Sequence, residues 1–181
     1  MRRLMVDIET ISSKPDAAVL AIGACVFTLD TIGETFEVII DAKRAVQYGR
    51  EDQSTRDWWA SQDPHVRARM FGGTVDPVDA AQRFAEFVKR ERVREVWANA
   101  PTFDCIILRH FFERTGVACP WHFRDERCAR TVMNEAKEYG LNYSRAYADA
   151  KAHDALSDAI AQAKAVQIIR AAFHPKQNAL L

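Results

Sequence analysis

LMVDIET, residues 4–10, has the composition of a buried β-strand, yet it places two acids, Asp7 and Glu9, inside the apolar run. Residues two apart on a strand point to the same side of the sheet, so the two carboxylates are expected side by side. Like charges at that distance resist joint ionisation, and burial strengthens the effect. The stretch therefore predicts that something in the folded protein compensates two neighbouring acids.

Two more strands follow this first one. Apolar and β-branched runs predict strands over residues 3–9, 18–29 and 34–40, with a turn at Ile32-Gly33. Strands joined by such short connections pair antiparallel. We therefore expect the sheet to begin with three antiparallel strands.

The rest of the chain reads mainly as helices, from apolar spacing and capping residues. The expected elements are a helix capped by Ser54 or Thr55, helices from Asp63 to about Met70 and from Asp76-Pro77, a strand over 94–99, a helix over 103–115, a strand or loop at 121–124, a helix over 126–138 and a last helix from near Asp154. This order predicts an α/β fold whose mixed central sheet starts antiparallel, continues with parallel strands and is flanked by helices.

Length and composition are those of an ordinary globular domain. The 181 residues, 48% apolar and 28% charged, suit one domain over 1–181, with a core at about 3–172 and a C-terminal tail at 173–181. No apolar run has the length of a membrane span, and Asp7 and Glu9 interrupt any signal-like core. We expect a cytoplasmic protein without a membrane partner.

Charge and cysteine usage narrow the function classes. With 25 basic and 25 acidic residues the formal charge is zero, which argues against a protein that coats long nucleic acids. Binding of a short stretch at the end of a nucleic acid is compatible with this charge. The four cysteines include no C-x-x-C pair, so buried thiols are favoured over a zinc site or a disulfide framework.

Two further acids occur where they can join Asp7 and Glu9. Asp104 opens a helix just after the strand that ends at Asn99, and Asp158 lies near the start of the last helix. Such positions converge on one cleft in an open mixed sheet. Four clustered carboxylates require cations, and their oxygens suit Mg²⁺ or Mn²⁺. Two such ions about 4 Å apart favour phosphodiester hydrolysis.

His153 supplies the remaining chemistry. It precedes Asp158 by five residues, about 500° on a helix, so the two do not share a helical face. We therefore expect His153 in the loop before the helix, with Asp154 as the N-cap. An imidazole there can accept the proton of an attacking water at neutral pH.

These residues resemble the DEDD superfamily of 3′–5′ exonucleases in its histidine subtype. The resemblance rests on Asp7 and Glu9 in DIET, Asp104 in NAPTFD, and His153 with Asp158 in HDALSD. It implies an RNase H-like fold, two metal ions held by the four acids, and His153 as general base. It also implies release of nucleoside 5′-monophosphates from single-stranded RNA or DNA 3′ ends.

Other segments place the chain within that superfamily. The tyrosine subtype needs a Tyr four residues before the last acid, where this chain has Asp154. STRDWWASQ (54–62) and RDERCART (124–131) look like the branch that holds the T-even phage DNA exonuclease A and mycobacterial-type exoribonucleases. Many proofreading relatives follow DIET with T-G-L, whereas here Ile11-Ser12-Ser13 follows, so their apolar wedge is not carried over.

Substrate contacts are expected near these motifs. Adjacent helical residues point about 100° apart, so one of Trp58 and Trp59 is expected in the core. The other would stack a base or lie at a subunit interface, as in a homodimer. Phe103 is a candidate for stacking or for the core, and arginines at every third position from Arg124 for phosphates or for a solvated face. The full candidate set is Thr10, Asn99, Phe103, Trp58 and Arg124.

Two other functions compete with an exonuclease. One is a catalytically silent nucleic-acid-binding module of the same fold, against which the presence of all five functional side chains argues. The other is a different metal phosphohydrolase, such as a haloacid-dehalogenase-like phosphatase, which needs D-x-D where this chain has Glu9 as second acid. The choice between RNA and DNA depends on local contacts to the 2′-OH, which no motif here identifies.

Overall fold

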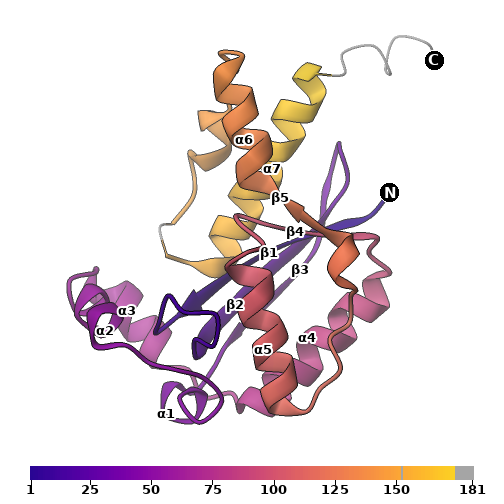
Figure 1. The fold of residues 1–181 in the computed structure, drawn as a ribbon. Helices are drawn as coiled ribbons and strands as arrows, with labels where there is room; N and C mark the ends of the chain where they lie inside the picture. Colours follow the sequence, from indigo (N-terminus) through magenta and orange to yellow (C-terminus); the bar gives the residue numbers. More distant parts are fainter. Residues whose placement is uncertain (152, 174–181) are drawn as a thin grey trace.

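A five-stranded mixed sheet forms the centre of the molecule (Figure 1). The computed structural model describes residues 1–151 and 153–173. The strand order is β3-β2-β1-β4-β5, with β1 antiparallel to β2, β2 antiparallel to β3, and β1, β4 and β5 parallel. The strands are β1 (Arg3–Thr10), β2 (Val19–Phe27), β3 (Ile32–Ile39), β4 (Glu95–Ala98) and β5 (Glu126–Cys128). The predicted mixed sheet is confirmed.

Helices cover both faces of this sheet. In Figure 1, α6 and α7 lie on one face, and α4 and α5 lie on the other. The helices are α1 (Ala42–Ala45), α2 (Gln53–Ala60), α3 (Pro64–Phe71), α4 (Pro77–Glu91), α5 (Asp104–Thr115), α6 (Ala129–Glu138) and α7 (Ala155–Phe173), with 3₁₀ turns η1 (Phe123–Asp125) and η2 (Ser144–Tyr147). Among these described helices, none is long and apolar enough to cross a membrane.

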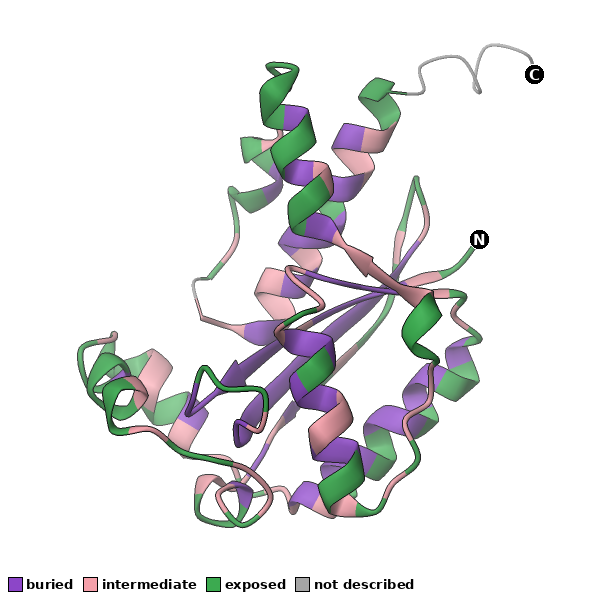
Figure 2. Ribbon diagram, in the orientation of Figure 1, coloured by how far each residue is buried: buried purple, intermediate pink, exposed green. Residues whose placement is uncertain are grey.

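Strand alternation divides the interior into two cores. Leu4, Val6 and Ile8 pack with α4 and α5, whereas Met5 packs with α6 and α7. Because side chains alternate along a strand, Asp7 and Glu9 continue the Met5 side. β2 is buried along its whole length, as expected for a strand covered on both faces (Figure 2). The acids thus lie where the α7-side core ends.

Gly23 brings the start of α7 onto the sheet. It pairs with Asp7 across the β1–β2 ladder. A Cβ at this position would lie 2.1 Å from the carbonyl carbon of Ala155 and from the backbone nitrogen of Leu156. Only a residue without a side chain allows this contact. The first turn of α7 is therefore held directly beside Asp7.

Most predicted elements are confirmed, including the caps Asp63 and Asp76 and the helix predicted over 103–115. The structure ends this helix at Gly116, whose backbone is left-handed at φ 70°. The prediction around 121–128 was wrong. Residues 123–125 form η1, the strand falls at 126–128, and α6 starts at Ala129, because β5 pairs with β4 before the chain turns helical.

Three smaller differences concern ends and caps. The N-cap of α2 is Asp52, not Ser54 or Thr55; its carboxylate accepts a 2.6 Å hydrogen bond from the Ser12 hydroxyl instead of from a helix amide. A short helix, α1, occupies part of the polar stretch 41–54. The tail expected at 173–181 overlaps the end of α7 at Phe173, and 174–181 lies outside the described residues.

Candidate active site

Three of the four predicted acids meet at the carboxyl end of β1. Each of Asp7, Glu9 and Asp158 offers a carboxylate oxygen, and these oxygens all lie within 4.8 Å of one another. Asp7 and Glu9 come from the same side of β1, and Asp158 from the first turn of α7 above Gly23. A set of carboxylate oxygens on rigid elements fits Mg²⁺ or Mn²⁺.

Asp104 stands beside this group of three. It opens α5 and is only 3% exposed. The backbone N–H groups of Asp104 itself and of Ile8, next to Asp7 on β1, lie near enough to its carboxyl to lower its pKa against the larger effect of burial. Its negative charge raises the pKa of both Asp7 and Glu9. Asp104 therefore belongs to the same electrostatic unit as the other acids.

The acids carry strongly perturbed pKa values. Burial, followed by the charges of Asp158 and Asp104, raises the pKa of Glu9 to about 8. Burial also raises the pKa of Asp104 to about 7 and holds that of Asp7 well above its ordinary range. Desolvation and like charges both disfavour the ionised form. Without cations, the folded protein therefore favours the protonated form of these acids more than an exposed carboxyl group would.

His153 lies in the loop before α7, as predicted. Its backbone is left-handed at φ 60°, a conformation that non-glycine residues adopt mainly where surrounding contacts impose it. Burial raises the pKa of the Asp158 carboxyl, and the nearby side chain and backbone N–H of His153 lower it. The imidazole meets the Trp58 ring edge to face, with ring centres 4.8 Å apart. His153 is thus fixed next to the acids from two sides.

Asp154 anchors this loop. Its Oδ1 accepts a 2.9 Å hydrogen bond from the Ser157 N–H, as expected for an N-cap. Its Oδ2 accepts a 2.7 Å hydrogen bond from Arg69 of α3, and Arg69 also donates to Glu37 of β3 at 2.7 Å. The loop that carries His153 is therefore tied to two neighbouring elements.

A pocket of about 300 Å³ opens beside Glu9. Trp58 and Phe103 line it together with Thr10, so three of the predicted substrate residues meet there. Trp58 is 40% exposed, whereas Trp59 is 1% exposed and donates a 2.8 Å hydrogen bond from Nε1 to the Thr10 carbonyl. The prediction that one tryptophan belongs to the core is confirmed, and the other faces this pocket.

Residues 2–170 match the family model of the Rv2179c-like 3′-5′ exoribonuclease domain. The chain belongs to this family. Among curated protein sequences, none matches it significantly.

Solved structures share the fold of this Rv2179c-like domain. E. coli exonuclease I in its zinc-bound complex with single-stranded DNA aligns with TM-score 0.74 and 14% identity over 97% of this chain and 41% of that one. The nuclease domain of 3′hExo, a DEDDh family member bound to rAMP, aligns with TM-score 0.62 and 10% identity over 95% and 92%. Cell-death related nuclease 4 gives 0.66 and 15% over 95% and 64%.

The chain spans about two fifths of the exonuclease I chain and most of the 3′hExo nuclease domain. The family match confirms the resemblance to 3′–5′ exonucleases, and these structures confirm the RNase H-like fold.

Gln162 is a site residue that the motifs did not reveal. Its Nε2 donates a 2.8 Å hydrogen bond to Asp7 Oδ1, and its Oε1, buried next to the acids, has no hydrogen-bond partner among the described residues. An unpaired buried oxygen is costly unless a further group reaches it. The available signal was a glutamine one helical turn after Asp158, within an otherwise apolar run.

The last two predicted substrate residues lie apart from the Trp58 pocket. Asn99, just past the end of β4, accepts hydrogen bonds from Arg130 at its carbonyl (3.0 Å) and side chain (3.4 Å). Arg124 lies over the Phe123 ring in η1, before β5 begins.

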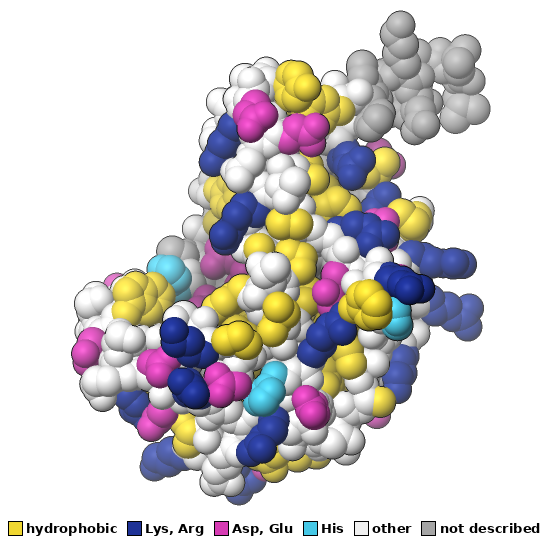
Figure 3. Space-filling view, viewed as in Figure 1, with side chains coloured by type: hydrophobic (Ala, Val, Ile, Leu, Met, Phe, Trp, Pro, Cys, Tyr) yellow, Lys and Arg dark blue, Asp and Glu magenta, His cyan; other side chains and the backbone are white. Residues whose placement is uncertain are grey.

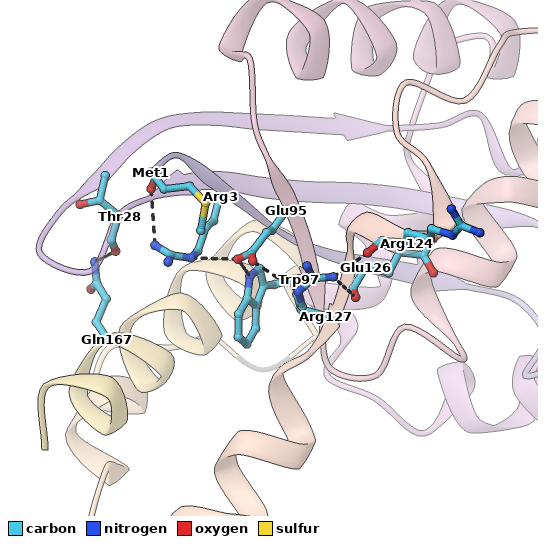
Figure 4. A network of polar contacts seen from close by, with 9 residues as sticks. All are labelled: Met1, Arg3, Thr28, Glu95, Trp97, Arg124, Glu126, Arg127 and Gln167. Atoms are coloured by element: carbon cyan, nitrogen blue, oxygen red, sulfur yellow. Dashed lines mark hydrogen bonds and ion pairs between the residues drawn. The ribbon is translucent and has the colours of Figure 1, made fainter. Parts of the chain in front are cut away.

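The structure does not bring Arg124 to the acids. Arg127 donates to the Arg124 carbonyl and pairs with Glu95, which also accepts from Arg3 at the start of β1 (Figure 4). These residues mark the amino-terminal ends of the parallel strands, whereas the acids lie toward the carboxyl end of β1. The three-residue spacing of Arg124, Arg127 and Arg130 suggested one helical face. Instead, Arg124 lies in η1, Arg127 in β5 and Arg130 in α6. Of the three, only Arg130 lies near Asp104, whose pKa it lowers.

Proposed function

We propose that this chain is a metal-dependent 3′–5′ exonuclease that acts on single-stranded RNA or DNA ends and releases nucleoside 5′-monophosphates. The observation that carries the proposal is the meeting of Asp7, Glu9 and Asp158 beside His153, in a member of a 3′-5′ exoribonuclease domain family. The family assignment favours RNA as the natural substrate.

The residues fit a pair of divalent cations, Mg²⁺ or Mn²⁺. Asp7, Glu9 and Asp158 would hold them, with Asp104 completing the negative charge. The raised pKa values and the unpaired Gln162 oxygen both support cation binding at this site. When bound, such ions offset the charge of the acids and stabilise the charge that develops on the phosphodiester.

Protein side chains provide proton transfer and substrate binding. His153 takes the proton from the attacking water, on a loop that Asp154 and Arg69 hold in place. The terminal nucleotide enters the pocket of Trp58, Phe103 and Thr10, where aromatic rings offer a stacking surface for any base. Because the pocket is small, it accepts one nucleotide at a time.

The same enzyme is expected in the cytoplasm, as one domain over residues 1–181. A homodimer would give the exposed Trp58 a second use at a subunit interface, which light scattering of the purified chain tests. A monomer would leave Trp58 to the substrate alone.

A labelled-substrate assay tests the function. Matched single-stranded RNA and DNA oligonucleotides and a small phosphate monoester are incubated with Mg²⁺, with Mn²⁺ and with EDTA. Metal-dependent shortening of an oligonucleotide, without hydrolysis of the monoester, supports the proposal. Hydrolysis of the monoester alone would indicate a phosphatase, and oligonucleotide binding without cleavage in either metal a silent module.

A further inference from the structure

A second and larger pocket shares no lining residue with the Trp58 pocket and lies next to Asn99, just past the end of β4. It has a volume of about 850 Å³ and runs between α6 and the segment over 140–147 that contains η2. We call it the α6–η2 groove. Its polar lining includes Asn99, Arg130, Asn134, Lys137, Tyr143 and Tyr147. None of the candidate catalytic residues lines it, so the site described above leaves it without a role.

One end of the groove lies at Asn99, at the start of the loop that leads to Asp104. Arg130, at its inner end, is held by two hydrogen bonds to Asn99, and its positive charge reaches Asp104. Burial raises the pKa of Tyr147, which also lines the groove, to about 12, with further contributions from Tyr143, Asp158 and Asp7. A strand leaving the acid cluster on this side therefore enters the groove directly.

The lining has the chemistry of a nucleic-acid surface. Arg130 and Lys137 are exposed cations on α6, and both line the groove. Among the described residues that line it there is no acid. In a chain of zero net charge, this is a local excess of positive charge beside a cluster of carboxylates. Figure 3 shows both basic and acidic side chains over α6, with further acidic side chains lower on the same face.

Two tyrosines add stacking surfaces to these charges. Tyr143 is half-buried, and Tyr147 is 36% exposed with its hydroxyl on the Met133 sulfur at 3.6 Å. Cations for phosphates and fixed aromatic rings for bases are the combination by which proteins hold single strands. Side-chain amides of the asparagines can bond sugars or base edges.

We infer that the α6–η2 groove binds the nucleotides on the 5′ side of the scissile phosphate, while the terminal nucleotide occupies the Trp58 pocket. The occupant is the same single strand that the proposed exonuclease degrades, so the inference rests on that function. It predicts that affinity grows with substrate length until the groove is filled, although the catalytic residues contact only the last linkage.

Lys137 offers the sharpest test, because it lines the groove about two helical turns beyond Arg130, away from Asn99. Binding of a fluorescein-labelled octamer and of a dinucleotide is measured in Ca²⁺, with the intactness of both checked on a gel. Lys137→Ala should weaken octamer binding roughly fivefold or more and dinucleotide binding less, and it should lower the salt slope by about 0.7. The matched control is Arg145→Ala, which removes an exposed cation of η2 that does not line the groove.

Tyr143 gives an independent readout. Tyr143→Ala should weaken octamer binding, and Tyr143→Phe should restore it, because stacking requires the ring and not the hydroxyl. Melting curves of all variants exclude unfolding. If wild-type protein shortens oligonucleotides but Lys137→Ala and Arg145→Ala bind octamer and dinucleotide alike, the groove is not the strand path, and the proposed function stands. If wild-type protein neither binds nor shortens oligonucleotides, both fail.

Discussion

Gln162 of α7 donates a 2.8 Å hydrogen bond to Asp7 of β1, and so joins the last helix to the first strand at the centre of the acids. An outer hydrogen bond of this kind fixes the orientation of a metal-binding carboxylate, and its loss typically costs 10–100-fold in metal affinity.

We therefore expect Gln162→Leu to weaken Mn²⁺ binding by about 10–100-fold in calorimetric titration. The matched control is Gln167→Ala on the same helix, whose side chain bonds the Thr28 and Thr31 carbonyls away from the acids. Equal Mn²⁺ affinity in the two variants would contradict a positioning role for Gln162.

Gly23 should tolerate no side chain. In Gly23→Ala the new Cβ would lie 2.1 Å from the Ala155 backbone, so α7 must move away from β2 and carry Asp158 with it. We expect a lower melting temperature and weaker metal binding together. Gly33→Ala is the control, because its Cβ would find its nearest neighbour at an ordinary 3.5 Å. A Gly23→Ala protein with unchanged Mn²⁺ affinity would show that Asp158 is not positioned by this contact.

The metal-free protein should lose stability as the pH rises. The pKa values of Glu9, about 8, and Asp104, about 7, lie above their ordinary values of 4.5 and 3.8, so the folded state binds more protons than the unfolded state between about pH 4 and 8. The free energy of unfolding then decreases with pH across that window.

Urea unfolding in EDTA at pH 5, 6, 7 and 8 measures this decrease. Asp104→Asn should flatten it, since one titrating group is removed and the repulsion that raises the pKa of Asp7 and Glu9 is reduced. Saturating Mg²⁺ should oppose it, because binding to the folded state alone adds stability. A free energy of unfolding that increases from pH 5 to 8 in EDTA would contradict the perturbed acids.

His153 should be needed for turnover but not for metal binding. We expect His153→Ala to lower the turnover number by about 10²–10⁴, the usual value of a positioned proton transfer, with Mn²⁺ affinity retained. His65→Ala, which removes an exposed imidazole from α3, is the control. Near-full activity of His153→Ala at neutral pH and saturating Mn²⁺ would reduce His153 to a loop residue.

The sequence predicted the parts of the site that short motifs encode. Asp7 and Glu9 follow from strand alternation, and the loop position of His153 follows from its spacing to Asp158 and from the Asp154 cap. The roles of Gln162 and Gly23 were not predicted, because they depend on α7 crossing β1 and β2. That contact joins segments more than a hundred residues apart in the sequence.

The position of Arg124 also could not be predicted from local sequence. An arginine at every third position indicates one helical face, but pairing of β5 with β4 overrides that local pattern, and the helix starts only at Ala129. Tertiary pairing therefore decided which arginine lies near the acids, and Arg130 is the one that does.

The direction of attack is the most direct test of the central claim. A 5′-labelled single-stranded RNA and a circular single strand of the same sequence are incubated with the protein and saturating Mg²⁺, with Asp158→Asn as the inactive control. We predict a ladder that shortens one nucleotide at a time from the 3′ end, nucleoside 5′-monophosphates as products, and an intact circle. Cleavage of the circle, or loss of the 5′ label as a mononucleotide at the earliest times, would contradict a 3′–5′ exonuclease.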